Sequence, residues 1–211
     1  MIAVIPTVFI VVSYLAGSIP FGLLIGLAKG VDIRKFGSGN IGATNLGRAV
    51  GLRYGLLAFT LDFLKGFGPA LAAKLFAGNQ SHSDFDRYDL PVLCALSAVL
   101  GHVFPAWLRF RGGKAGATGL GVGAVLCWQA MLVAATAWLI VWAVTRYISL
   151  ATMLASVAFS IAYVIIALRE GTPFDREHAS LTAFCAFAMI LVIARHWSNI
   201  QRLRDGTEAK V

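Results

Sequence analysis

The chain has 211 residues, of which 58% are hydrophobic and 13% are charged, and its mean hydropathy is +0.77. Soluble globular proteins have about 45–50% apolar and about 25% charged residues, so this composition excludes an ordinary soluble domain and indicates a protein in contact with lipid. The formal net charge is +8. The basic residues occur in short segments between apolar runs, which argues against nucleic acid as a partner and favours anionic lipid or a phosphorylated substrate.

Six apolar runs approach the length that crosses a membrane, since a hydrocarbon core of about 30 Å needs about 20 helical residues. In chain order they are residues 2–27, 56–76, 90–108, 118–144, 148–168 and 181–194. The first run is too long for a signal peptide and has no basic segment before it, so we expect it to be retained.

The basic residues between the runs predict the orientation. Segment 29–53 contains five Lys and Arg, segment 109–114 contains three, segment 195–210 contains four, and Arg146 stands alone. These segments are expected on the cytoplasmic side, and the connections at 84–89 and 169–177 outside. That arrangement requires an odd number of crossings.

We therefore predict an all-α, polytopic membrane helix bundle that forms a single domain over residues 1–211. It should have seven transmembrane helices, with the N-terminus outside and the C-terminus cytoplasmic. The extra crossing is expected in run 118–144, as two short helices that turn near Trp128 and Gln129. The alternative is five spans with one re-entrant run.

The three cysteines, Cys94, Cys127 and Cys185, lie inside apolar runs. Their spacing matches neither a C-x-x-C motif nor a metal-ligand set, so we expect no disulfide framework, no metal and no other cofactor.

A glycine-rich segment over residues 32–48 is the first candidate site. Glycine permits positive φ, and successive backbone N–H groups in such a loop can bind a phosphate or carboxylate. Arg48 would add a bidentate contact to the anion. A flexible interhelical turn is the alternative. The nucleotide-binding pattern G-x-x-x-x-G-K-[ST] is absent.

The second candidate segment covers residues 101–118. Gly112 and Gly113 precede Lys114, and we expect Thr118 to be the N-cap of the next helix. An anion held at that helix terminus would gain unpaired N–H groups and the helix dipole. The alternatives are a membrane anchor for Lys114 and a hydrogen-bonded structural histidine for His102.

The third candidate segment covers residues 195–208. On a helix His196 and Asn199 would share a face, bordered by Arg195 and Arg202. Imidazole, amide and guanidinium groups together suit a phosphate or a developing oxyanion. The alternative is a basic juxtamembrane tail. Residues after Glu208 are expected to fray.

Two charged residues also stand inside the second run, Asp62 and Lys65, and their i, i+3 spacing favours a structural ion pair. The motifs H-x4-D and G-x-S-x-G are absent, and no cysteine has a plausible histidine partner in a polar segment. The chain is therefore suited to positioning two phosphorylated substrates rather than supplying a nucleophile.

In order and spacing, these motifs resemble those of the bacterial acyl-phosphate:glycerol-3-phosphate acyltransferase family, often called PlsY. The resemblance covers essentially the whole chain, through Gly17-Ser18-Ile19-Pro20, residues 32–51, Lys65-Gly66, residues 101–118, Ser149-Leu150 and residues 195–208. One departure follows Lys114. The family pattern continues Gly, Val, Ala, Thr, whereas this chain has Ala115, Gly116, Ala117 and Thr118.

The resemblance implies a seven-span enzyme of the bacterial inner membrane with its active site on the cytoplasmic side. It would move a fatty acyl group from acyl phosphate to the sn-1 hydroxyl of glycerol 3-phosphate, giving lysophosphatidic acid and phosphate in the first step of phospholipid biosynthesis. Membrane lipid is a further partner, and neither acyl carrier protein nor coenzyme A is expected to take part directly.

The resemblance also implies site residues. The catalytic set is Lys114, Arg48, His196 and Asn199. The substrate-binding set is Ser38, Gly39, Asn40, Thr44, Asn45, Gly112, Gly113, Thr118, Ser149 and Arg202.

For the mechanism, we expect direct attack of the glycerol 3-phosphate hydroxyl on the acyl carbonyl, without an acyl-enzyme. The base would be a phosphate oxygen of the donor or His196. Two other functions are alternatives. A transporter for a phosphorylated solute would favour paired halves, which the sequence does not show. A CDP-alcohol phosphotransferase would need an Asp cluster, and only Asp32 and Asp205 are predicted on the cytoplasmic side.

Overall fold

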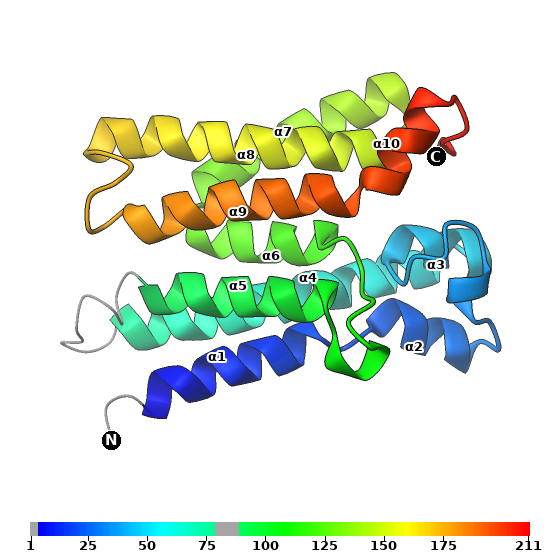
Figure 1. Cartoon of the computed structure of the whole chain (residues 1–211), viewed down its shortest axis with the longest axis horizontal. Coiled ribbons are helices and arrows are strands. Elements are labelled where there is room, and N and C mark those ends of the chain that lie inside the picture. Colours follow the sequence, from blue (N-terminus) through cyan, green and yellow to red (C-terminus); the bar gives the residue numbers. More distant parts are fainter. Residues whose placement is uncertain (1–3, 79–88) are drawn as a thin grey trace. The chain divides into compact units, whose positions relative to one another are not determined.

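The computed structural model describes residues 4–78 and 89–211, and in these ranges helices are the regular secondary structure (Figure 1). The chain divides into two compact units, Met1–Val125 and Leu126–Val211. The described residues include five helical segments that are long and apolar enough to cross a membrane, and a bent helix pair that would be a sixth. The all-α prediction is confirmed, and the single domain and the count of seven helices stay predictions.

The first unit contains most of the short helices. Its elements are α1 (Val4–Gly17), α2 (Phe21–Ala28), the 3-10 helix η1 (Ile33–Lys35), α3 (Ala43–Val50), α4 (Leu52–Gly78), α5 (Leu90–Val103), the 3-10 helix η3 (Ala106–Leu108) and α6 (Gly116–Leu126). Helix α1 packs against α4 and α5, and α3 packs against α4. The predicted outward connection at 84–89 lies outside the described residues except for Asp89.

The first apolar run is broken, which differs from the continuous span predicted over residues 2–27. Helix α1 ends at Gly17 and α2 begins at Phe21, directly after Pro20, whose ring lacks an N–H donor. Side chains bind the carbonyls at the break. Nε1 of Trp107 donates to the Ser18 carbonyl at 2.8 Å, and Nζ of Lys65 donates to the Ile19 carbonyl at 2.7 Å.

The fourth apolar run is also two helices, as predicted. Helix α6 ends at Leu126, Cys127 has φ −150° and ψ 86°, and α7 (Trp128–Thr145) begins at the next residue. At about 1.5 Å per residue the 11 residues of α6 extend about 16 Å, roughly half a hydrocarbon core. Nζ of Lys74, in α4, donates to the Val125 carbonyl at 2.7 Å.

Gly66 permits close packing of α4 against the start of α6. A Cβ atom on Gly66 would overlap the backbone oxygen of Thr118, whereas a Cβ on Gly68 would meet no atom within 4 Å. Both positions lie inside α4, so alanine gains the same helix propensity at each, about 1 kcal/mol.

We expect Gly66→Ala to destabilise the protein by about 1–3 kcal/mol net of that gain, because backbone atoms must move to admit the methyl group. The matched control Gly68→Ala should be neutral or slightly stabilising. Thermal unfolding of both variants in the same detergent measures the difference. Equal melting temperatures would contradict the close approach of α4 and α6.

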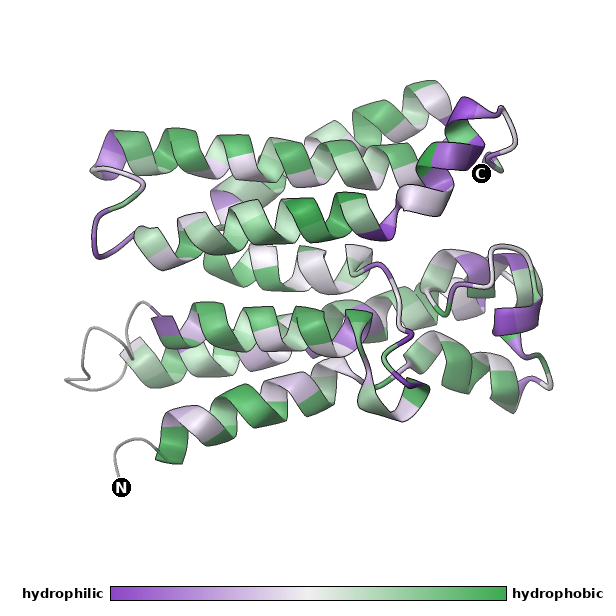
Figure 2. Cartoon of the chain, in the orientation of Figure 1, coloured by the Kyte–Doolittle hydropathy of each residue, from purple (hydrophilic) through white to green (hydrophobic). Residues whose placement is uncertain are grey.

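The second unit contains α7, α8 (Ile148–Glu170), α9 (Ala179–Arg195) and α10 (Trp197–Arg204). Helix α8 packs against both α7 and α9. Its apolar core contains Phe159, Tyr163 and Cys185, surrounded by small side chains. Helices α9 and α10 meet at His196 with a bend of 53°. In Figure 2 the long helices are mostly hydrophobic, and hydrophilic residues gather in α10 and in the segment before α3.

The connection between α8 and α9 is organised by one carboxylate. Asp175 accepts hydrogen bonds from the Thr172 N–H at 3.1 Å and from Nδ1 of His178 at 2.8 Å. These bonds lower the pKa of Asp175 to about 2. Nε2 of His178 lies 3.4 Å from a carboxylate oxygen of Glu170. The predicted outward position of this connection stays a prediction.

Candidate active site

The glycine-rich loop before α3 has the backbone that its composition predicts. Gly37 and Gly39 have φ of 54° and 68°, a region that favours glycine. The Oδ1 atom of Asn40 accepts from the Gly42 N–H at 2.8 Å, and the Ser38 hydroxyl accepts from the Asn40 N–H at 3.4 Å. Ser38 is exposed at the loop surface.

Asn45 stabilises this loop through hydrogen bonds from its side-chain amide to the loop backbone. Its side-chain amide is buried, and its Nδ2 atom donates to the carbonyls of Ile33, Phe36 and Asn40 at 2.8–3.0 Å. Its Oδ1 atom accepts from the Ser38 N–H at 3.1 Å. The amide predicted to bind substrate is thus engaged with the protein backbone, and its observed role is to fix the loop.

Exposed polar side chains border the same loop. Thr44 and Arg48 are exposed on α3. Asp32 accepts from the Arg34 guanidinium at 2.9 Å, and this hydrogen bond lowers the pKa of the Asp32 carboxyl to about 2. Because Asp32 is paired with Arg34, the negative charge nearest to the loop in sequence is already neutralised.

The segment before Lys114 is held by backbone hydrogen bonds. The N–H groups of Gly112 and Gly113 donate to the carbonyls of Val103 and His102, each at 3.0 Å. A Cβ atom on Gly113 would overlap Nε2 of His102, so a side chain has no room there. Both glycines are predicted above to bind substrate. Their N–H groups donate to carbonyls of the same chain and fix the backbone that precedes Lys114.

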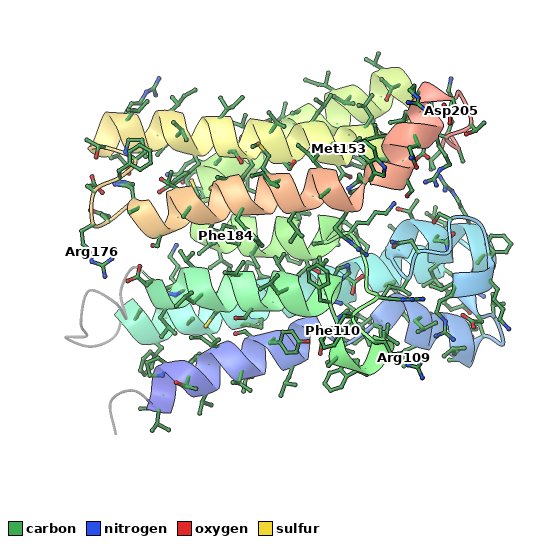
Figure 3. All side chains as sticks on the ribbon, in the orientation of Figure 1. Arg109, Phe110, Met153, Arg176, Phe184 and Asp205 are labelled. Atoms are coloured by element: carbon green, nitrogen blue, oxygen red, sulfur yellow. The ribbon has the colours of Figure 1, made fainter. Side chains whose placement is uncertain are left out.

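Three non-glycine residues in this segment have positive φ. Arg109 and Phe110, labelled in Figure 3 on the turn after η3, have φ of 51° and 60°. Ala115 has φ 60° and is buried. Ala115 is also the position at which the family pattern has glycine. A left-handed conformation costs an alanine about 1–2 kcal/mol, so the turn after Lys114 is strained in this chain.

Thr118 does not have the position predicted for it. Helix α6 begins at Gly116, so Thr118 lies inside the first turn and is not the N-cap. Its side chain is fully buried, and the hydroxyl donates to the Asp62 carbonyl at 3.0 Å. The prediction of an N-cap is wrong because the helix already starts at Gly116.

In the second unit, three predicted site residues converge on a carboxylate that the sequence did not single out. Glu208 accepts from the Ser149 hydroxyl at 2.7 Å, from Nδ2 of Asn199 at 2.6 Å and from Nε of Arg202 at 2.7 Å. Burial opposes ionisation of Glu208, but the three hydrogen bonds outweigh it and lower its pKa below the ordinary value. The sequence feature that could have indicated this contact is an acidic residue six positions after Arg202.

The residues after Glu208, expected to fray, contact the connection between α7 and α8. The Val211 N–H donates to the Arg146 carbonyl at 3.0 Å, and Nζ of Lys210 lies 5.5 Å from the centre of the Tyr147 ring. These contacts fasten the tail to the connection between α7 and α8.

His196 lies at the bend between α9 and α10 and is buried. Its Nδ1 atom is 2.8 Å from the Val192 carbonyl. A carbonyl only accepts, so Nδ1 carries the proton and Nε2 of the neutral ring has a lone pair. Asn199 follows in the first turn of α10.

Membrane-spanning helices that end in glycine-rich and basic segments define a multi-pass integral membrane protein suited to anionic substrates. The family model described as glycerol-3-phosphate acyltransferase matches residues 7–206, and the chain belongs to this family.

Relatives in two bacteria and two solved structures are similar to nearly the whole chain. A glycerol-3-phosphate acyltransferase of Gluconobacter oxydans is 45% identical over 203 residues, covering 95% of this chain and 90% of the relative. One of Anaeromyxobacter dehalogenans is 40% identical over 94% of both chains.

The solved structures are those of PlsY (YgiH), an integral membrane glycerol 3-phosphate acyltransferase. The glycerol 3-phosphate form is 37% identical, with a TM-score of 0.84 over 98% of this chain and 95% of that one. The lysophosphatidic acid form is 36% identical, with a TM-score of 0.81 over 97% and 94%.

Proposed function

We propose that this chain transfers a fatty acyl group from acyl phosphate to the sn-1 hydroxyl of glycerol 3-phosphate, giving lysophosphatidic acid and phosphate. The observation that carries the proposal is the likeness of nearly the whole chain to an acyltransferase solved in forms named for glycerol 3-phosphate and lysophosphatidic acid. The chemistry agrees, because both proposed substrates carry a phosphate and the two candidate sets of site residues contain basic, hydroxyl and amide groups.

The proposed donor makes a protein nucleophile unnecessary. Acyl phosphate is a mixed anhydride and is already activated, so the sn-1 hydroxyl can attack its carbonyl carbon directly. The bond from that carbon to the phosphate oxygen then breaks, and inorganic phosphate leaves. A phosphate oxygen of the donor or Nε2 of His196 accepts the hydroxyl proton, and holding the two substrates together provides much of the acceleration.

In the first unit, we assign phosphate binding to the exposed edge of the glycine-rich loop and to α3, through Ser38, Gly39, Asn40, Thr44 and Arg48. Lys114 and Arg48 stabilise the charge on the departing phosphate. Gly112, Gly113, Asn45 and Thr118 support this set by fixing the backbone.

In the second unit, we assign His196 and Asn199 to the reacting groups. Ser149 and Arg202 complete that set, and Glu208 aligns it by accepting hydrogen bonds from Ser149, Asn199 and Arg202.

The distribution of Lys and Arg supports a location in the bacterial inner membrane, with seven transmembrane helices, the N-terminus outside and the C-terminus and active site on the cytoplasmic side. The break at Cys127 supports the seventh helix, because it divides one apolar run into α6 and α7.

Purified protein tests the reaction. With acyl phosphate, glycerol 3-phosphate and a metal chelator, we expect equal amounts of lysophosphatidic acid and phosphate, without acyl carrier protein or coenzyme A. Mass spectrometry of the protein during turnover should show no acyl adduct. Transfer that requires an acyl thioester, or that stops with chelator, would refute the proposed donor or the metal-free mechanism.

A further inference from the structure

A buried charged cluster lies inside the first unit, behind the segment that carries Lys114. Asp62, Lys65 and His102 are only 3%, 6% and 5% exposed. Nζ of Lys65 is 2.7 Å from Oδ1 of Asp62, which confirms the predicted ion pair, and Nδ1 of His102 is 3.9 Å from the same oxygen. Neither Asp62 nor Lys65 has a part in the acyl transfer described above.

Three other segments approach the turn of α4 that carries the ion pair. Lys65 donates to the Ile19 carbonyl at the break between α1 and α2. The backbone carbonyl of Asp62 accepts from the Thr118 hydroxyl in the first turn of α6. His102, in the last turn of α5, lies beside the Asp62 carboxylate.

His102 in turn supports the loop. Its backbone carbonyl accepts from the Gly113 N–H, and its ring fills the space that a side chain at Gly113 would need. The ring therefore has Asp62 on one side and Gly113, the neighbour of Lys114, on the other. A shift of the ring must be transmitted to Gly113, because no gap separates them.

Packing alone does not require charges at this depth. A buried ion pair gives little or no net stability over apolar side chains of similar volume, and charges inside a membrane-spanning helix are costly. The hydrogen bond from Lys65 to the Ile19 carbonyl and a carboxylate charge beside the His102 ring are what an apolar pair could not provide.

We propose that Asp62, Lys65 and His102 are positioning residues for Lys114. The ion pair fixes the His102 ring, the ring and carbonyl of His102 fix Gly113, and the ammonium of Lys114 is thereby held where phosphate charge develops. This inference rests on the proposed role of Lys114 in acyl transfer. It assigns the cluster to the chemical step, so its loss should reduce kcat.

The test compares Asp62→Asn, Lys65→Met and the double variant, with kcat and KM for glycerol 3-phosphate measured beside thermal stability. Each single variant leaves one buried charge without its partner and should unfold at a lower temperature. The double variant removes both charges and should recover most of that loss. Its kcat should stay about tenfold or more below the parent, with KM within about twofold, because small displacements of a catalytic group cost about 10- to 100-fold.

Lys74→Met is the matched control, since Lys74 also lies on α4 and also donates to a backbone carbonyl. It should alter stability without the loss of kcat. A double variant with parental kcat would overturn the positioning role.

If the double variant does not fold, His102→Gln decides the question. It should lower kcat about tenfold at near-parental stability, and unchanged kcat would overturn the proposal. Lys114→Ala distinguishes a failure of the proposed site from a failure of the proposed positioning role. Activity in Lys114→Ala refutes the proposed site itself, whereas an inactive Lys114→Ala beside a fully active double variant refutes only the role of the cluster.

Discussion

Replacing Lys114 by alanine should lower kcat for acyl transfer at least about 100-fold while the protein remains folded in detergent. The proposed role of the ammonium is to stabilise charge that grows on the departing phosphate, and removal of one preorganised group of this kind costs about 100- to 1,000-fold in kcat. The measurement is steady-state release of phosphate from acyl phosphate at saturating glycerol 3-phosphate, together with the melting temperature.

Arg111→Ala provides the control for this experiment. Arg111 is an exposed cation in the same segment, three residues before Lys114, and belongs to neither set of site residues. Its loss should change turnover by no more than about twofold. If both variants lose activity equally, the effect would be one of general positive charge, and Lys114 would have no special place in the site.

Replacing Glu208 by alanine should destabilise the second unit by about 2–4 kcal/mol. The Glu208 side chain is only 8% exposed, and removing one partner of a buried charged pair costs about 3–5 kcal/mol. The Arg202 side chain is 33% exposed, so water reduces that cost. Transfer activity should also fall, because Ser149 and Asn199 lose their common acceptor. Thermal unfolding and turnover measure the two effects.

The lowered pKa of Glu208 also predicts the pH at which this contribution disappears. In the unfolded chain the carboxyl titrates near its ordinary value of 4.5, and in the folded protein it titrates below that. Its stabilisation is therefore fully present above pH 4.5 and is lost as the pH falls through the lower folded value.

Glu208→Gln isolates this effect from other carboxylates. Its melting temperature should be lower than that of the parent at pH 7, and the difference should shrink below pH 4.5. Asp205→Ala is the matched control, because Asp205 is an exposed acid three residues earlier (Figure 3). A parental melting temperature for Glu208→Ala would exclude a stabilising role for the hydrogen bonds that Glu208 accepts.

Hydropathy predicted the helices well because membrane-spanning segments must satisfy their backbone hydrogen bonds internally. The division of run 118–144 near Trp128 followed from counting charges, which required one more crossing. The break at Ser18–Pro20 was missed. Hydropathy averages over a window, and a single proline barely changes that average. The missing N–H and fixed φ of Pro20 accompany a break between helices, whereas Pro69 lies inside the continuous helix α4.

The site was harder to predict than the fold. Composition identified a loop of glycines and polar side chains, and Gly37 and Gly39 have the positive φ expected of it. The sequence does not show whether a polar group faces a ligand or its own backbone. Asn45 and Thr118 are examples, since both bind backbone carbonyls. Glu208 was missed because spacing does not show that Asn199 and Arg202 bind it together with Ser149, which is 59 residues away in the chain.

Because all three cysteines are buried, we expect thiol reagents to label the native protein little. Maleimides that cannot enter lipid will find no native target, so one exposed residue at a time can be converted to cysteine without first removing Cys94, Cys127 or Cys185. In intact cells, Lys35→Cys would report the sidedness of the segment before α3, and Asp205→Cys that of the segment after α10.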